Sequence, residues 1–208
     1  MNIVSIDIGI ISLGLVACEL EPSYRIKKAT YCKLVNLTKE CTTTNCKLYH
    51  TNTITDRMMH FFQEHSDLLN NAYVILIERQ IPTSGLCAIQ ELIFYTFRNK
   101  AILISPSSMH AHFSIGWLDY EKRKKATIDL ASSFLNFHEE FVFNEKKDDL
   151  ADAWCYIKFW SDVKAKEYHI EKIKEEWLKN QSFESLDQFR YTPEIDAITM
   201  ELENTKIQ

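Results

Sequence analysis

Two short apolar segments of this chain each carry an acidic residue at the carboxyl end, and this feature limits the possible folds most. Residues 73–78 read Tyr-Val-Ile-Leu-Ile-Glu and end at Glu78. Residues 2–8 read Asn-Ile-Val-Ser-Ile-Asp-Ile, and their alternation puts Asp7 on one face with Ile3 and Ser5. Such runs are typical of β-strands. We therefore predict two strands, each with an acidic side chain at its carboxyl end.

The rest of the chain alternates between strand-like and helix-like segments. Gly9 permits a turn after the first strand, and the short connection favours an antiparallel hairpin. Further strands are predicted at residues 13–18, 30–37 and 101–104, and helices at residues 55–69, 86–98, 122–137 and 147–168. This order predicts an α/β domain with a mixed five-stranded sheet flanked by helices, in which the first and fourth strands lie side by side.

Length and charge divide the chain into two parts. A chain of 208 residues with 46% hydrophobic content has room for one domain with a full core and an appendage. Residues 1–168 carry 20 acidic and 19 basic side chains, so most of the net charge of −5 belongs to the remainder. We predict a domain at residues 1–168 and an acidic, partly helical C-terminal extension at residues 169–208. Residues 38–54, rich in Thr, Asn and Cys, are predicted to be a loop or insertion.

The sequence indicates a soluble, intracellular protein without a membrane segment. Ser5 and Asp7 interrupt the first apolar run, which argues against a signal peptide. No uninterrupted stretch approaches the roughly 20 apolar residues of a membrane span. The six cysteines are scattered through a chain with a sizeable core, which favours reduced thiols over a disulfide scaffold.

One series of residues resembles a zinc site in its residue types. It consists of Cys32, Cys41, Cys46 and His50. Its spacings are irregular and it contains no Cys-x-x-Cys pair. We therefore favour ordinary thiols in a loop over a metal site.

The acidic residues predict a metal site. Residues at the same end of neighbouring parallel strands lie roughly 5 Å apart, so Asp7 and Glu78 can share a cation. Asp149 and Asp152, three residues apart on a predicted helix, point the same way. Gathered carboxylates repel one another unless divalent cations share them, and such oxygen ligands suit Mg²⁺ or Mn²⁺. Alternatively, Asp7 and Glu78 are turn residues, and the helical acids complement a helix dipole.

Basic residues begin the predicted helix at residues 122–137, and aromatic residues lie in the loop before it. The run of Lys122, Arg123, Lys124 and Lys125 either contacts phosphates or forms a solvated helix start. The aromatic residues of the loop before it either stack on unpaired bases or anchor the core; they are Phe113, Trp117 and Tyr120.

Five motifs together resemble the poxvirus-type Holliday junction resolvases, which are similar to bacterial RuvC and share the RNase H-like fold. The resemblance extends over residues 1 to about 165. The motifs are Ser5-Ile6-Asp7-Ile8-Gly9, Ile77-Glu78-Arg79-Gln80, Ile104-Ser105-Pro106, Arg123-Lys124-Lys125 and Lys146-Lys147-Asp148-Asp149-Leu150-Ala151-Asp152.

This resemblance implies a homodimer that cuts four-way DNA junctions with paired, symmetric nicks, using Mg²⁺ or Mn²⁺ with two ions at each site. If the protein is viral, the resemblance implies that it acts at sites of viral DNA replication. The implied metal ligands are Asp7, Glu78, Asp149 and Asp152, Lys125 resembles the basic residue near the scissile phosphate, and residues 122–125 are implied to bind DNA. Apolar surface for a dimer is available on helices containing Phe94, Phe97, Phe134 and Phe137, although core packing accounts for these residues equally well.

Three other functions compete with the resolvase. An RNase H activity on RNA–DNA hybrids shares the metal chemistry. An actin-like ATPase or sugar kinase also opens with a strand and Asp-x-Gly, but needs more glycine-rich phosphate loops than four dispersed glycines supply. A non-catalytic junction-binding protein has no need of four carboxylates.

Overall fold

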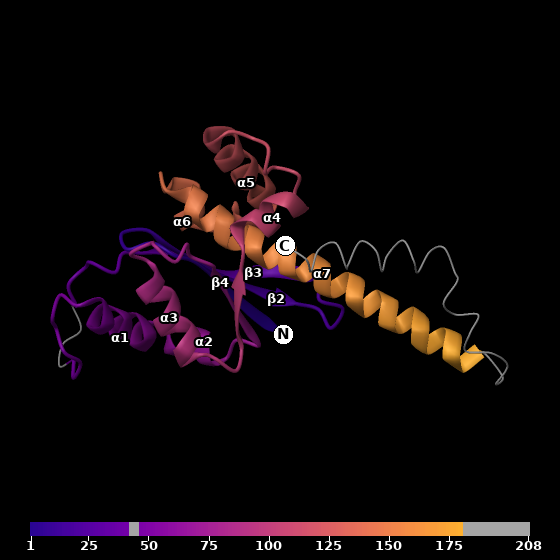
Figure 1. Ribbon diagram of the computed structural model, residues 1–208, viewed down its shortest axis with the longest axis horizontal. Helices are drawn as coiled ribbons and strands as arrows, with labels where there is room; N and C mark the ends of the chain where they lie inside the picture. Colours follow the sequence, from indigo (N-terminus) through magenta and orange to yellow (C-terminus); the bar gives the residue numbers. More distant parts are fainter. Residues whose placement is uncertain (42–45, 181–208) are drawn as a thin grey trace.

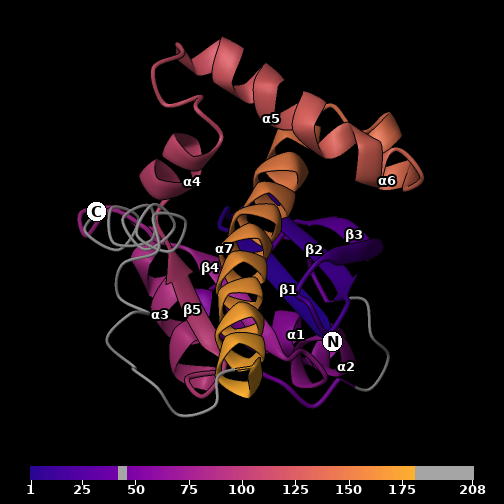
Figure 2. The ribbon, with the colours of Figure 1, turned by 90° about the vertical axis from the view of Figure 1, so that its right-hand side faces the viewer.

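A computed structural model describes residues 1–41 and 46–180 of the chain. Five strands form one mixed sheet, as the sequence predicts, and its order is β3-β2-β1-β4-β5 (Figures 1 and 2). The strands are β1 (Asn2–Asp7), β2 (Leu13–Leu20), β3 (Ile26–Val35), β4 (Val74–Glu78) and β5 (Ala101–Ile104). Strands β1, β2 and β3 pair antiparallel, whereas β4 pairs parallel to both β1 and β5. The two strands that end in acidic residues are therefore parallel neighbours.

Helices cover both faces of this sheet (Figures 1 and 2). One face is covered by α1 (Ile54–Glu64), α2 (Ser66–Asn70) and α3 (Cys87–Thr96). The other is covered by α4 (Pro106–His112), α5 (Tyr120–Leu135), α6 (Glu139–Phe143) and α7 (Lys147–Asn180). Each face has its own apolar cluster, so the strands read as nearly continuous apolar runs.

The alternation of β1 decides which side of the sheet carries the chemistry. Val4 and Ile6 are buried against the α1 and α3 side, while Ile3 is buried against α7. Side chains two residues apart in a strand share a face. Asp7 therefore belongs to the face that α7 covers.

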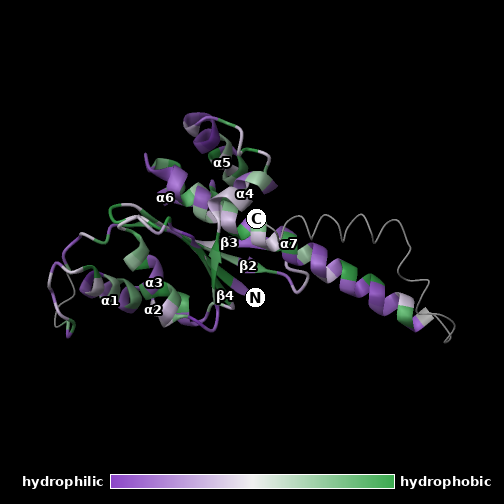
Figure 3. Ribbon diagram, viewed as in Figure 1, coloured by the Kyte–Doolittle hydropathy of each residue, from purple (hydrophilic) through white to green (hydrophobic). Residues whose placement is uncertain are grey.

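Helix α7 is one continuous helix of 34 residues. Its first half packs on the sheet through Leu150, Trp154 and Ile157, and its second half extends beyond the sheet (Figure 1). In this outer half hydrophilic residues alternate with apolar ones (Figure 3). The predicted boundary between residues 168 and 169 falls inside the helix, which continues from the predicted helix at residues 147–168 into the predicted extension. Residues 181–208 of the predicted extension lie outside the described residues.

Strand β3 begins at Ile26, earlier than the predicted residue 30, and three other differences concern the helices. The helix predicted at residues 55–69 is divided at His65 into α1 and α2. The predicted loop after β5 contains α4, which begins at Pro106, a residue suited to the first helical position. A short helix, α6, lies between the last two predicted helices.

Within residues 1–41 and 46–180, no helix combines the length and the apolar character that a membrane span requires.

Candidate active site

The register of the two parallel strands brings Asp7 and Glu78 together. Ile6 of β1 is the partner of Ile77 in β4, so the following residues of both strands emerge at the same edge of the sheet. The backbone N–H of Ile8 donates to Glu78 Oε2 at 3.4 Å, which holds this carboxylate toward β1. The first two predicted acids are thus neighbours at the carboxyl ends of two central strands.

A close approach between α7 and the sheet adds the other two acids. Gly14 of β2 is the register partner of Asp7. A Cβ atom at Gly14 would lie 2.4 Å from the backbone oxygen of Asp149 and 3.4 Å from Asp7 Cβ. The absence of a side chain at this position therefore lets the first turn of α7 rest against β1 and β2, with Asp149 and Asp152 beside Asp7.

The electrostatics of Asp7 reflect this convergence. Its side chain is buried, and burial raises the pKa of Asp7 well above the usual aspartate value. The charges of Glu78 and Asp152 raise the pKa of Asp7 further. Burial also raises the pKa of Asp149, although a hydrogen bond from Ser12 opposes this rise. Concentrated negative charge in a buried place favours any cation that reaches it.

Lys124 is the cation that reaches the acids within the described chain. Its Nζ atom lies 2.7 Å from Asp152 Oδ2, 3.2 Å from Asp148 Oδ2 and 3.7 Å from Asp149 Oδ1. Burial by itself lowers the pKa of Lys124, but the charge of Asp152 and its neighbours outweighs it and raises this pKa well above the usual lysine value. Lys124 is therefore a fixed positive charge at the edge of the carboxylate cluster.

The other members of the basic run lie farther out on α5. Lys125 and Lys122 are exposed, and Lys122 pairs with Asp119 at 2.8 Å. Arg123 is half-buried, and its guanidinium lies 5.9 Å from the centre of the Tyr120 ring. Of the predicted DNA-binding residues, the structure thus brings only Lys124 to the acids and leaves the other three around the start of α5.

Of the three aromatic residues predicted to lie in the loop before the basic run, one anchors the core and two are exposed. Phe113 packs against the core of the α7 face, as an anchor does. Trp117 is 81% exposed and Tyr120 is 58% exposed. The Trp117 indole donates to the Ser114 carbonyl oxygen at 2.7 Å, which fixes the ring at the surface.

Sequence reasoning missed three residues that support the site. Gln80 donates from Nε2 to Glu78 Oε2 at 2.5 Å, and its own backbone N–H donates to Gln90 Oε1 at 2.6 Å. Tyr156 is buried on α7, and burial, followed by the charges of Asp7 and Glu78, raises its pKa well above the usual tyrosine value. Gln80 stands in a quoted motif, whereas nothing in the sequence singles out Gln90 or Tyr156.

A fourth missed residue, His110 of α4, lies on the Lys124 side of the site. Burial lowers the pKa of His110, and the nearby charge of Arg123 lowers it further, while Asp152 opposes both effects. Together these effects favour the neutral form of the imidazole. The predicted loop contains two histidines, His110 and His112, and nothing in the sequence singles out His110.

The donor set fits hard divalent cations. Asp152 Oδ1 is buried and has no hydrogen-bond partner among the described residues, although its other oxygen binds Lys124. Buried polar atoms without a partner are rare, and an absent ion is one explanation. The four predicted ligands present only carboxylate oxygens, which Mg²⁺ and Mn²⁺ prefer.

The fold defines a class. A mixed five-stranded sheet of order β3-β2-β1-β4-β5, with helices on both faces, is the RNase H-like architecture that RuvC also has. The chain belongs to the family described as Poxvirus A22 protein, whose model matches residues 1–160. That range includes all four predicted ligands. No curated protein is significantly similar to the chain in sequence.

Solved structures share this fold. The fowlpox virus resolvase in complex with its substrate Holliday junction DNA is 20% identical, with a TM-score of 0.57, and the match covers 78% of this chain and 97% of that chain. The yeast mitochondrial Holliday junction resolvase is 19% identical, with a TM-score of 0.55 and coverage of 80% and 82%. Thermus thermophilus RuvC is 13% identical, with a TM-score of 0.51 and coverage of 78% and 96%. At these identities the likeness establishes the fold.

Proposed function

We propose that this protein is a structure-selective endodeoxyribonuclease that resolves four-way and other branched DNA junctions by paired, metal-dependent nicks. The observation that carries the proposal is the gathering of Asp7, Asp149 and Asp152 with Glu78 at one edge of the sheet. Membership of the Poxvirus A22 protein family supports it, as does the likeness in fold to a fowlpox resolvase solved with junction DNA. For a viral protein, such a substrate would arise where viral DNA is replicated in the host cell.

Asp7, Glu78, Asp149 and Asp152 would hold Mg²⁺ or Mn²⁺, two ions in each site. The chemistry that such ions supply, when bound, is activation of a water for attack on the phosphodiester and stabilisation of the leaving 3′ oxygen. The orphaned Oδ1 of Asp152 supports this assignment. Gln80 holds the Glu78 carboxylate in place through its Nε2 hydrogen bond.

Lys124 supplies positive charge beside these ligands. Its ammonium lies within hydrogen-bond distance of Asp152 and is oriented by Asp148 and Asp149 as well. A preorganised charge of this kind stabilises negative charge that develops on a phosphate during its displacement. The resemblance assigns this role to Lys125, the next residue, and the two lysines are therefore tested side by side.

DNA would lie across the start of α5, where Lys122, Arg123 and Lys125 contact its phosphates. Contacts of this kind fix the position of the duplex and carry no base information. Trp117 and Tyr120 are exposed beside them and can stack on bases left unpaired at a crossover. Selection for branched DNA would then depend on shape and not on sequence.

Paired nicks require two active sites, which a homodimer provides. Of the four phenylalanines considered for the interface, Phe97 is buried, Phe94 packs partly buried against the same apolar cluster, and Phe134 packs on Trp154 at 5.1 Å between ring centroids. Phe137 is 91% exposed, and Phe143 of α6 is 82% exposed. The apolar surface at the end of α5 and on α6 is therefore our candidate for the dimer interface.

The deciding experiment incubates the purified protein and its Asp7→Asn variant with Mg²⁺ or Mn²⁺ and a panel of substrates. Four-way, forked and duplex DNA and an RNA–DNA hybrid are compared. We expect symmetric nicks in branched DNA alone, no cleavage by Asp7→Asn, and junction binding by both proteins. Equal cleavage of the hybrid would favour an RNase H, and binding without cleavage by the unmodified chain would favour a non-catalytic junction-binding protein.

A further inference from the structure

A second cluster of metal-ligating side chains lies outside the candidate active site. Cys41, Cys46 and His50 come from the predicted insertion, and His60 comes from α1. One ligand atom from each of these four residues lies within 4.8 Å of all the others. Bonds of about 2.3 Å to sulfur and about 2.0 Å to nitrogen put the ligands of a tetrahedral zinc ion roughly 3.3–3.8 Å apart. A contraction of about 1 Å would therefore complete such a site.

The orientation of His60 matches that of a metal ligand. Its Nε2 atom lies 3.1 Å from the backbone oxygen of Tyr49, and an N–H there can donate to this carbonyl. That tautomer leaves Nδ1 unprotonated, and Nδ1 lies 3.8 Å from Cys46 Sγ. Metal-binding histidines commonly donate their other ring N–H to a carbonyl or carboxylate, which fixes the ring for coordination. The His50 ring lies beside it, with 4.9 Å between ring centroids.

The segment that carries Cys46 and His50 has few apolar contacts of its own that would hold it in place, and a bound metal ion would supply such a hold. Residues 46–53 form neither helix nor strand, and none of their side chains is fully buried. This segment therefore has little apolar contact to hold it against the domain. Helix α1, in contrast, is anchored to the sheet through Met58 and Phe61. An ion shared by His60 and the segment would fasten the segment to an element that is already rigid.

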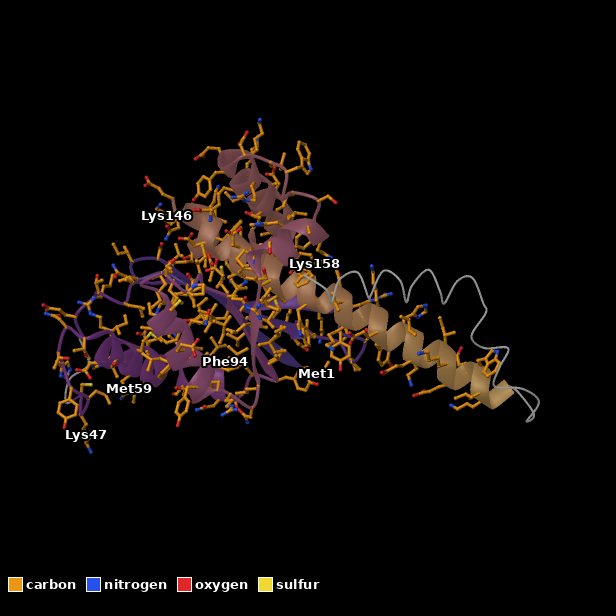
Figure 4. The ribbon with its side chains drawn as sticks, in the orientation of Figure 1. Met1, Lys47, Met59, Phe94, Lys146 and Lys158 are labelled. Carbon is orange, nitrogen blue, oxygen red and sulfur yellow. The ribbon has the colours of Figure 1, made fainter. Side chains whose placement is uncertain are left out.

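We propose that Cys41, Cys46, His50 and His60 bind one structural Zn²⁺ ion. Two sulfur and two nitrogen ligands favour zinc over the hard cations proposed for the carboxylate site. Four protein ligands leave no open position, so the ion holds structure and takes no part in the cleavage reaction. The two sites are well separated, since Lys47 beside Cys46 and Lys146 just before α7 lie far apart in Figure 4.

The ligand set differs from the zinc-like series in the sequence. Cys32 lies in β3 and packs toward the α7 face, where burial and the charge of Glu140 raise the pKa of its thiol to about 12. His60 takes its place. Sequence spacing missed His60 because this residue belongs to a helix that follows the insertion, and only the fold brings it close to the two cysteines and His50.

The test measures bound metal in the full-length protein after dialysis against a low concentration of ZnCl₂. We expect about one zinc per chain, and almost none in Cys46→Ser or His60→Ala. His60→Cys, which keeps a ligand, should retain zinc. Two matched controls should retain it as well: Cys87→Ser, which changes a thiol on α3, and Asp7→Asn, which changes the carboxylate site.

Spectroscopy of the unmodified protein provides a readout that does not depend on the folding of any variant. Replacing zinc with Co²⁺ should give the intense visible absorption of a tetrahedral cobalt site together with thiolate charge-transfer bands. Octahedral cobalt absorption, zinc content unchanged in Cys46→Ser, or a Cys41–Cys46 disulfide found by thiol counting would each overturn the proposal. Loss of zinc in Asp7→Asn alone would assign the ion to the carboxylates.

Discussion

The Nζ atom of Lys124 lies 2.7 Å from Oδ2 of Asp152, and this ion pair joins α5 to the first turns of α7. The side chains of Lys124 and Asp152 are 20% and 13% exposed, so solvent screens their interaction only partly. The helix that carries the basic run is therefore linked to the helix that carries two of the acids. The positive charge proposed for the phosphate and two of the proposed ion ligands are therefore positioned by one contact.

Lys124→Ala and Lys125→Ala should separate the roles of these adjacent lysines. We expect Lys124→Ala to slow single-turnover cleavage of a four-way junction by about 10²–10³-fold, because a preorganised charge is removed. Its junction affinity should change little. Lys125→Ala should instead weaken binding and flatten the dependence of binding on salt, because an exposed phosphate contact is lost. The reverse pattern would return the role near the scissile phosphate to Lys125.

Gly14→Ala should impair cleavage without altering any predicted ligand. The new Cβ atom would lie 2.4 Å from the Asp149 backbone oxygen, so the first turn of α7 must move away from the sheet. Overpacking of this kind costs about 1–3 kcal/mol, which chemical denaturation measures. Gly85→Ala is the matched control, since nothing lies within 4 Å of its added Cβ. Normal cleavage by Gly14→Ala would mean that α7 does not set the position of its acids through this contact.

Asp7→Asn should raise the thermal stability of the metal-free protein. A carboxyl group whose pKa is higher in the folded than in the unfolded chain favours folding most below its unfolded pKa, and this advantage is lost as pH rises through the folded pKa. At neutral pH an aspartate at this position therefore destabilises the fold relative to a residue that cannot ionise, and Asp7→Asn removes this penalty. Each kcal/mol gained shifts the unfolding midpoint by about 2–4 °C.

The same variant should lose most of the stabilisation that Mg²⁺ gives. Ligands that bind only the folded state raise its stability with concentration, and Asp7 is a proposed ligand. Melting curves of both proteins with increasing MgCl₂ measure this difference. An equal rise for Asp7→Asn and the unmodified chain would remove Asp7 from the metal site.

Phe137→Glu should weaken the proposed dimer. The Phe137 side chain is 91% exposed, so a charge there costs the folded monomer little but disrupts an apolar interface. We expect light scattering to detect monomers, and a cruciform plasmid to be nicked in one strand and not linearised. Tyr95→Glu, which changes an 80% exposed side chain on α3, should leave both results unchanged. A dimer that survives Phe137→Glu would require a different interface.

Much of the fold was predictable because the apolar pattern follows the sheet closely. The strand ending at Glu78 and the alternation of β1 predicted two central strands, and the parallel pairing of these strands is confirmed. The division at His65 was not predictable, because the apolar spacing of the segment continues across it. The continuity of α7 was missed because its apolar residues thin out beyond the sheet while the helix itself persists.

The candidate site was predictable as far as residue types allow. Four acids converge because two lie at strand ends and two on one helical face, and both periodicities can be read from the sequence. The choice between Lys124 and Lys125 depends on the rotation of α5 relative to α7, which a run of four basic residues does not reveal. Gln90 and Tyr156 act through neighbours, so they carry no sequence signature of their own.

Because α7 is unbroken, the whole helix is one stiff rod about 50 Å long. Two of the proposed ion ligands lie near one tip, and the other tip extends past the edge of the sheet (Figure 1). Any partner that bound the outer end would therefore be held at a fixed distance from the candidate active site.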